Sequence, residues 1–175
     1  MSWSKSLFLI GVLVVLSGCG FKPIYGDRHG QNVKAEFSAI KIELIEDRIG
    51  QQLHNHLLDK INPFGRPASP RYSLTVKLSE SKRELAVKKS ELATRANLIF
   101  TATFSLTRLR PTSKALLTGT SEVVSSYNIL QSDYATSVAE KDARRRAVRE
   151  LSAEIANRLA VYFQLQNDPQ NREIK

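Results

Sequence analysis

The only cysteine of this 175-residue chain, Cys19, stands where a lipid-transfer reaction would use its thiol. It follows Leu16-Ser17-Gly18 and an apolar run that begins at Leu7, with Lys5 as a positive flank. The run is too short to cross a bilayer core of about 30 Å, which needs about 20 helical residues, and has the form of a secretory leader. Because a thiolate is the nucleophile that takes up a lipid, we predict cleavage before Cys19 and lipidation of its sulfur. The alternative is an ordinary leader followed by a free cysteine, a liability in an oxidising compartment.

Histidines and carboxylates are the other groups that could do chemistry, and their spacing does not favour catalysis. His54 and His56 lie two apart in a predicted helix, so their side chains diverge by about 200° and cannot share a metal. The sequence contains no G-x-S-x-G, H-E-x-x-H or phosphate-binding glycine motif. Asp133, Glu140 and Asp142 lie near arginines and are interpreted as ion-pair partners. We therefore expect no enzymatic activity, no metal and no cofactor.

A group of basic residues around the junction of the second and third predicted strands is a candidate polyanion site. Lysines act as point charges and arginines as bidentate forks for phosphate. The alternative is a hairpin tip whose charges serve solubility alone. The group consists of Lys82, Arg83, Lys88, Lys89 and Arg95.

A second basic group, residues 144–146 with Arg149, lies on the last predicted helix. Successive helical residues rotate by about 100°, so these arginines cannot all face one way. Partner or phosphate contact is one interpretation of the group. A solvated face paired with Glu140, Asp142 and Glu150 is the other.

Hydroxyl side chains occupy the outward positions of the third and fourth predicted strands. A sheet face rich in hydroxyls and poor in charge suits either water or a polar wall, and β-propensity on a solvated face is the alternative explanation. The residues that we predict to face a partner are Thr101, Thr103, Thr118 and Thr120.

The net charge of +9 would favour nucleic acid as a ligand in a cytosolic protein. An exported lipoprotein meets anionic lipids and acidic protein surfaces instead, so we expect no nucleic-acid partner. A hydrophobic content of 42% is typical of a globular domain with a core, and one cysteine permits no internal disulfide.

The elements that position these residues follow from periodicity. Alternation predicts strands at 37–44, 72–78, 96–106 and 115–127, and a period of four predicts helices at 48–62 and 137–165. The order β-α-β-β-β-α predicts an α+β two-layer sandwich, a four-stranded mainly antiparallel sheet with two helices on one face. The expected organisation is a leader (1–18), a lipidated tether (19–34), one domain (35–165) and a polar tail (166–175).

Several segments resemble the LptE family of lipopolysaccharide-assembly lipoproteins in its alphaproteobacterial form. The match at the predicted mature N-terminus is Gly18–Gly26, which includes a lipobox-like cysteine. Others are Arg48–Leu53, Ala93–Leu98, Ser126–Asn128, Tyr134–Thr136 and Ala139–Arg144. They occur in family order over nearly the whole predicted mature chain.

This resemblance implies an outer-membrane lipoprotein of a Gram-negative bacterium that lies on the periplasmic side. It would plug and help assemble the LptD β-barrel as a heterodimer, and it would bind lipopolysaccharide during insertion into the outer leaflet. The family fold it implies, a small sheet with two helices on one face, agrees with the pattern above. The competing hypothesis is a general periplasmic-facing lipoprotein adaptor that binds peptidoglycan or another envelope complex.

Overall fold

The computed structural model describes residues 27–85, 95–111 and 114–167 of the chain. Helix α2 (Asp27–Phe37) leads into the short strand β1 (Ile40–Ile42) and helix α3 (Asp47–Ile61). Three long strands then follow one another, and helix α4 ends the described chain. These last elements are β2 (Tyr72–Leu85), β3 (Arg95–Arg108), β4 (Lys114–Asn128) and α4 (Asp133–Asn167).

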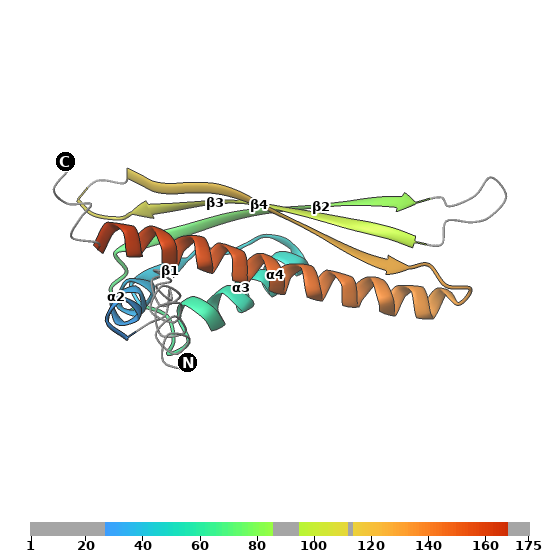
Figure 1. The fold of residues 1–175 in the computed structure, drawn as a ribbon, viewed down its shortest axis with the longest axis horizontal. Coiled ribbons are helices and arrows are strands. Elements are labelled where there is room, and N and C mark those ends of the chain that lie inside the picture. Colours follow the sequence, from blue (N-terminus) through green and yellow to red (C-terminus); the bar gives the residue numbers. More distant parts are fainter. Residues whose placement is uncertain (1–26, 86–94, 112–113, 168–175) are drawn as a thin grey trace, which may run out of the picture.

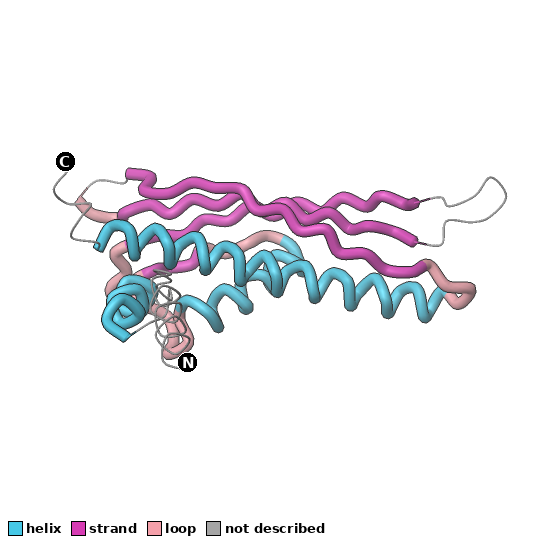
Figure 2. Tube along the Cα trace, viewed as in Figure 1, coloured by secondary structure: helices cyan, strands magenta, loops and turns pink. Residues whose placement is uncertain are grey.

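The four strands form one sheet in the order β1-β2-β3-β4. β1 runs parallel to β2, and the other two pairings are antiparallel. All three helices lie on one face of the twisted sheet, and α4 runs beneath its whole length (Figures 1 and 2). The predicted α+β two-layer sandwich with a mainly antiparallel sheet is confirmed, with α2 as an additional helix.

Alternation along β3 and β4 divides the sheet into an inner face toward the helices and an outer face. Residues of β3 from Ala96 to Leu106 are buried at every second position. Gly119 of β4 lies opposite Phe104, and a Cβ atom built on this glycine would stand 2.6 Å from Cζ of that ring. The glycine therefore makes room for a phenylalanine that is only 1% exposed.

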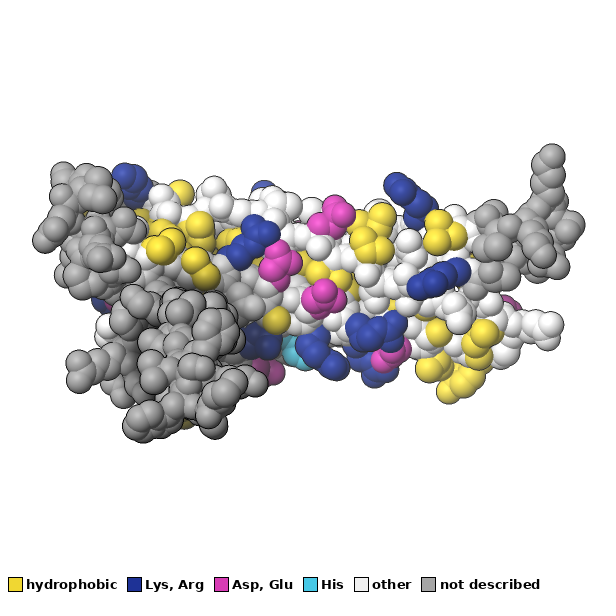
Figure 3. Space-filling model, in the orientation of Figure 1, with side chains coloured by type: hydrophobic (Ala, Val, Ile, Leu, Met, Phe, Trp, Pro, Cys, Tyr) yellow, Lys and Arg dark blue, Asp and Glu magenta, His cyan; other side chains and the backbone are white. Residues whose placement is uncertain are grey.

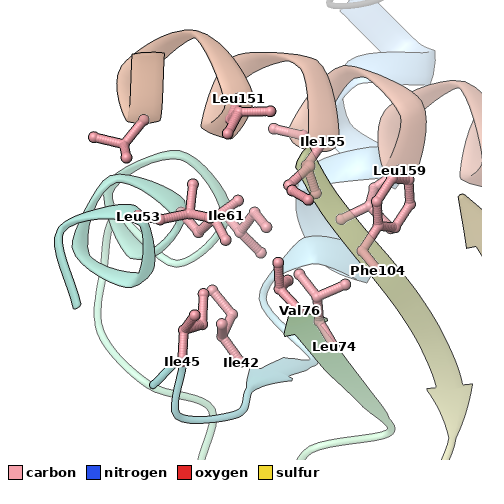
Figure 4. Packing of buried hydrophobic residues seen from close by; sticks show 14 of the residues in the cluster. Ile42, Ile45, Leu53, Ile61, Leu74, Val76, Phe104, Leu151, Ile155 and Leu159 are labelled. Atoms are coloured by element: carbon pink, nitrogen blue, oxygen red, sulfur yellow. The ribbon is translucent and has the colours of Figure 1, made fainter. Parts of the chain in front are cut away.

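Helix α4 packs on the sheet through residues spaced four apart. Ala143 and Ala147 are fully buried in its first half, and Leu151, Ile155 and Leu159 continue the stripe. The small alanines permit a close approach to the strands. In the centre of the core, Leu151 and Ile155 lie near Leu53 and Ile61 of α3 (Figure 4). A four-residue period thus positions the helix, as the sequence predicts.

The sequence does not predict helix α2, which covers residues inside the expected tether (19–34). Val33 and Phe37, one turn apart, are 1% and 4% exposed, and the Phe37 ring stands edge-on to Phe163 of α4 at 6.3 Å between centroids. The expected strand 37–44 is only three residues long, Ile40–Ile42. Helix α4 also extends two residues past the expected end of the domain.

Helix α4 begins at Asp133, four residues before the predicted start at residue 137. The Ser132 hydroxyl instead accepts a hydrogen bond from the Ala135 N–H at 3.4 Å. Glu140 is then free to bind other side chains. The expected leader, Cys19, the tether up to residue 26 and the tail from residue 168 lie outside the described residues.

Candidate functional site

The basic group predicted at the β2–β3 hairpin is divided between the two faces of the sheet. Arg83 pairs with Asn97 and Leu85 pairs with Arg95, so Arg83 and Arg95 are diagonal neighbours on the outer face. Both are exposed. Lys82 is adjacent to Arg83 on an alternating strand and therefore projects toward the helices. Lys88 and Lys89 lie outside the described residues.

Lys82 belongs to a cluster on the inner face rather than to a free basic surface. Its ammonium lies 5.7 Å from the centroid of the Tyr127 ring and 3.3 Å from Oε1 of Glu84. The Tyr127 hydroxyl, and after it the Glu84 carboxylate, raise the pKa of Lys82. The same hydroxyl donates a hydrogen bond to Glu140 at 3.1 Å. Lys82 is thus already engaged with protein groups.

Arg144 is the centre of this cluster and joins the extended part of β2 to α4. Its guanidinium lies 2.9 Å from Oε1 of Glu80 and 2.5 Å from Oε1 of Glu140. All three side chains are between 22% and 28% exposed. The two carboxylates raise the pKa of Arg144 against the opposing effect of its burial, which is the largest single contribution. Local sequence gives no signal of the Glu80 contact, since 64 residues separate the partners.

The other arginines of the second basic group lie on a solvated helix face. Arg145 and Arg146 both pair with Asp142. Figure 3 shows cationic and anionic side chains interspersed along the middle of the molecule. The interpretation as ion pairs with Glu140 and Asp142 is confirmed. Within the described residues, Asp133 and Glu150 form no ion pair, contrary to the sequence interpretation.

The hydroxyl-bearing residues lie together on the outer face of the sheet. Thr103 is directly opposite Thr120, Thr101 is opposite Glu122, and Ser105 is opposite Thr118. No helix among the described residues covers this face (Figure 1). Thr103, Thr118 and Thr120 are exposed and Thr101 is half-buried, so the predicted outward orientation is confirmed.

His54 has a structural role. His54 is 5% exposed, and its Nδ1 lies 3.1 Å from the carbonyl oxygen of Glu43. Among the residues that the structure describes, no three histidine, cysteine or acidic side chains are placed to hold a metal ion. No described helix has a stretch long and apolar enough to cross a membrane.

The protein-family model for LptE, described as Lipopolysaccharide-assembly, matches residues 37–161. The match spans the sheet and all of α3, and it leaves out helix α2 apart from Phe37 and the last residues of α4. The chain belongs to the LptE family. The resemblance noted in the sequence is therefore confirmed, and the chain is a lipopolysaccharide-assembly lipoprotein of the Gram-negative cell envelope.

Individual proteins are similar to this chain over most of its length. The uncharacterized protein RP188 of Rickettsia prowazekii (strain Madrid E) is 26% identical over 157 residues, which are 90% of this chain and 96% of that protein. Among solved structures, the rare lipoprotein B of Shewanella oneidensis superposes with a TM-score of 0.54 at 12% identity, covering 70% of this chain and 93% of its own. A minor lipoprotein of Acinetobacter baumannii gives 0.54 at 16% identity, with coverages of 71% and 92%. At such identities the two structures show a shared fold.

Proposed function

We propose that this chain is a non-catalytic outer-membrane lipoprotein that is anchored through Cys19 and plugs the LptD β-barrel. In this role it helps the barrel to assemble and binds lipopolysaccharide as it enters the outer leaflet. The observation that carries the proposal is the outer sheet face, which no described helix covers and which consists largely of small hydroxyl side chains. Barrel interiors are polar, so such a face fits a barrel wall better than a lipid or a protein core.

Photocrosslinking in the native envelope tests the outer face directly. Crosslinkers at Thr103 and Thr120, which are opposite one another on β3 and β4, should capture LptD. A crosslinker at Arg149, exposed on α4, is the matched control for the helix side. Capture of LptD at Arg149 without capture at either threonine would show that LptD contacts the helix face, and it would contradict the proposal.

Affinity purification from the solubilised envelope separates this proposal from the adaptor hypothesis. LptD in equimolar amount supports the plug. Recovery of peptidoglycan or of a different envelope complex, without LptD, would support a general adaptor. Mass spectrometry of the same preparation tests the anchor, because the mature N-terminus should be a lipid-modified Cys19. We expect Cys19→Ala to impair localisation or assembly more than lipopolysaccharide contact.

For lipopolysaccharide, the hairpin end remains the proposed contact, with Arg83 and Arg95 as its outer-face residues. Lys82 is a weaker candidate than its neighbours because Tyr127 and Glu84 already engage it. The charge-reversal variant Lys88→Glu/Lys89→Glu and the variant Arg83→Glu/Arg95→Glu should each lower lipopolysaccharide affinity. Arg145→Glu/Arg149→Glu makes the same change in net charge on α4, and an equal loss there would refute a localised contact.

A further inference from the structure

An open cavity of about 700 Å³ lies at the end of the sheet opposite the β2–β3 hairpin. Its wall is made by the segment that enters β2 and by the end of β3. Arg71, Arg108 and Arg110 contribute three guanidinium groups, and Ser69 and Tyr72 lie beside them. None of the described residues that line the cavity is acidic.

The cationic charge in this cavity is only partly compensated. Nη2 of Arg71 lies 2.9 Å from Oε2 of Glu36. The guanidinium carbons of Arg71 and Arg108 lie 5.5 and 5.9 Å from the centroid of the same Tyr72 ring. Within the described ranges, no carboxylate is within ion-pair distance of Arg108 or Arg110. Two guanidiniums thus share one ring, and a bound anion would offset their repulsion.

Helix α2 lies at this same end, as its contacts with Arg71 and Phe163 show. Cys19 precedes Asp27 by eight residues, which span at most about 28 Å when fully extended. The β2–β3 hairpin is at the opposite end of the sheet. Helix α4, with 35 residues and a length of about 52 Å, runs along the sheet between the two ends. Chain length therefore limits Cys19 to within about 28 Å of the start of α2, the helix that contacts Arg71 at the arginine cavity.

We propose that Arg71, Arg108 and Arg110 form a binding site for the phosphate of anionic phospholipid headgroups, which holds this end of the domain against the membrane surface. The proposal uses the proposed lipidation of Cys19 to place that membrane, whereas binding itself requires no lipid anchor. A lipid chain and a basic patch together give firmer attachment than either alone. Arginine suits the role because its fork binds two phosphate oxygens at once.

The test uses a chain that begins at residue 20, which has neither leader nor cysteine. It keeps the whole core, whose members run from Val33 to Phe163. Cosedimentation with phosphatidylcholine vesicles, with and without phosphatidylglycerol, measures the preference for anionic headgroups. Arg108→Gln/Arg110→Gln should weaken binding to the anionic vesicles about 30-fold, since each cation near such a surface is worth roughly fivefold.

The matched control is Arg145→Gln/Arg149→Gln, which removes the same charge from α4. These residues are at least 14 positions from Phe163, so they lie about 20 Å or more from the cavity end, beyond a Debye length of about 10 Å. The control should lose less than about threefold in binding. Both variants change exposed side chains, and an unchanged unfolding midpoint confirms the fold.

Equal losses in the two variants would overturn the site, because binding would then follow net charge alone. Equal binding to both vesicle types would overturn it as well. Displacement of the protein by millimolar inorganic phosphate at constant ionic strength would assign the cavity to a free anion rather than a membrane. Lipid-modified Cys19 is scored separately by mass spectrometry, so failure of the anchor and failure of the cavity give different results.

Discussion

Substitution of Arg144 by glutamine tests how the hairpin end of the sheet is fixed to α4. The arginine bridges Glu80 of β2 and Glu140 of α4, so its loss removes an ionic contact between the strand and the helix. Both carboxylates then remain in place without their shared cation. We expect a less stable domain whose hairpin end loses its connection to the helix first.

The expected magnitude follows from burial. Exposed ion pairs contribute about 0.2–1 kcal/mol, whereas breaking a fully buried pair costs about 3–5 kcal/mol. The Glu80 and Arg144 side chains are 26% and 28% exposed, which places the pair between these limits but nearer the first. We expect Arg144→Gln to lower the free energy of unfolding by about 1–2 kcal/mol, and the coupling with Glu80 to be about 1 kcal/mol.

Urea unfolding of four proteins measures this coupling in a double-mutant cycle. They are the wild type, Glu80→Gln, Arg144→Gln and the double variant. The Arg145–Asp142 pair, 3.4 Å apart with side chains 60% and 48% exposed, supplies the control cycle. Hydrogen exchange then shows whether β2 beyond Ser79 loses protection before the rest of the sheet.

A coupling for Glu80–Arg144 no larger than that of the control pair would refute the argument. In that case the partial burial of the pair would not strengthen the ionic contact, and Arg144 would contribute no more to stability than an exposed arginine does. Uniform loss of protection throughout the sheet would contradict the local role, even if the stability change had the expected size.

Three further predictions concern the core and the pH dependence of stability. Gly119→Ala places a Cβ 2.6 Å from the Phe104 ring and should cost about 1–3 kcal/mol in urea unfolding, despite the better strand propensity of alanine. Leu151→Ala removes a fully buried side chain and should cost about 2–5 kcal/mol in the same assay. The Ser73 hydroxyl, and after it Lys41, lower the pKa of the Glu43 carboxyl from 4.5, so this contact stabilises the fold above that pH and is lost on acidification. Ser73→Ala should therefore reduce the stability difference between pH 7 and pH 3.

Matched controls exist for the two core variants. Thr120→Ala, on the exposed outer face beside Gly119, should change stability by less than about 0.5 kcal/mol. Val161→Ala, on α4 but 41% exposed, should cost less than about 1 kcal/mol. A loss in either control equal to that of its partner variant would show that the strand or helix, and not the packing, is responsible. An unchanged pH profile in Ser73→Ala would remove Glu43 as a contributor.

The parts of the fold that were predictable depend on local periodicity. The alternation in β3 and the four-residue stripe in α4 can be recognised from residues that are close together in sequence, and the structure contains both. Helix α2 is different, because Val33 and Phe37 are its only large apolar side chains and the segment also contains glycine and asparagine. Its burial depends on Phe163, which lies 126 residues further along the chain.

The site follows the same division. The outward orientation of Thr103 and Thr120 follows from the pleat alone. The inward orientation of Lys82 follows from the same alternation, because Lys82 is an even number of residues after the inward-facing Tyr72. This prediction requires knowing that β2 continues to Leu85. No local sequence pattern predicts the arginine cavity. It forms because the pairing of β2 with β3 places Arg108 opposite Tyr72.

The length of α4 sets a scale for the whole molecule. At about 52 Å it exceeds the roughly 30 Å of a bilayer's hydrocarbon core and the 40–45 Å that include the headgroups. The long strands run beside it (Figure 1), so the described domain is a rod elongated along α4. If the arginine cavity rests on one membrane surface and the rod stands upright, Arg83 and Arg95 reach the level of the opposite headgroups. A single folded domain then spans the distance between the headgroups of the two leaflets.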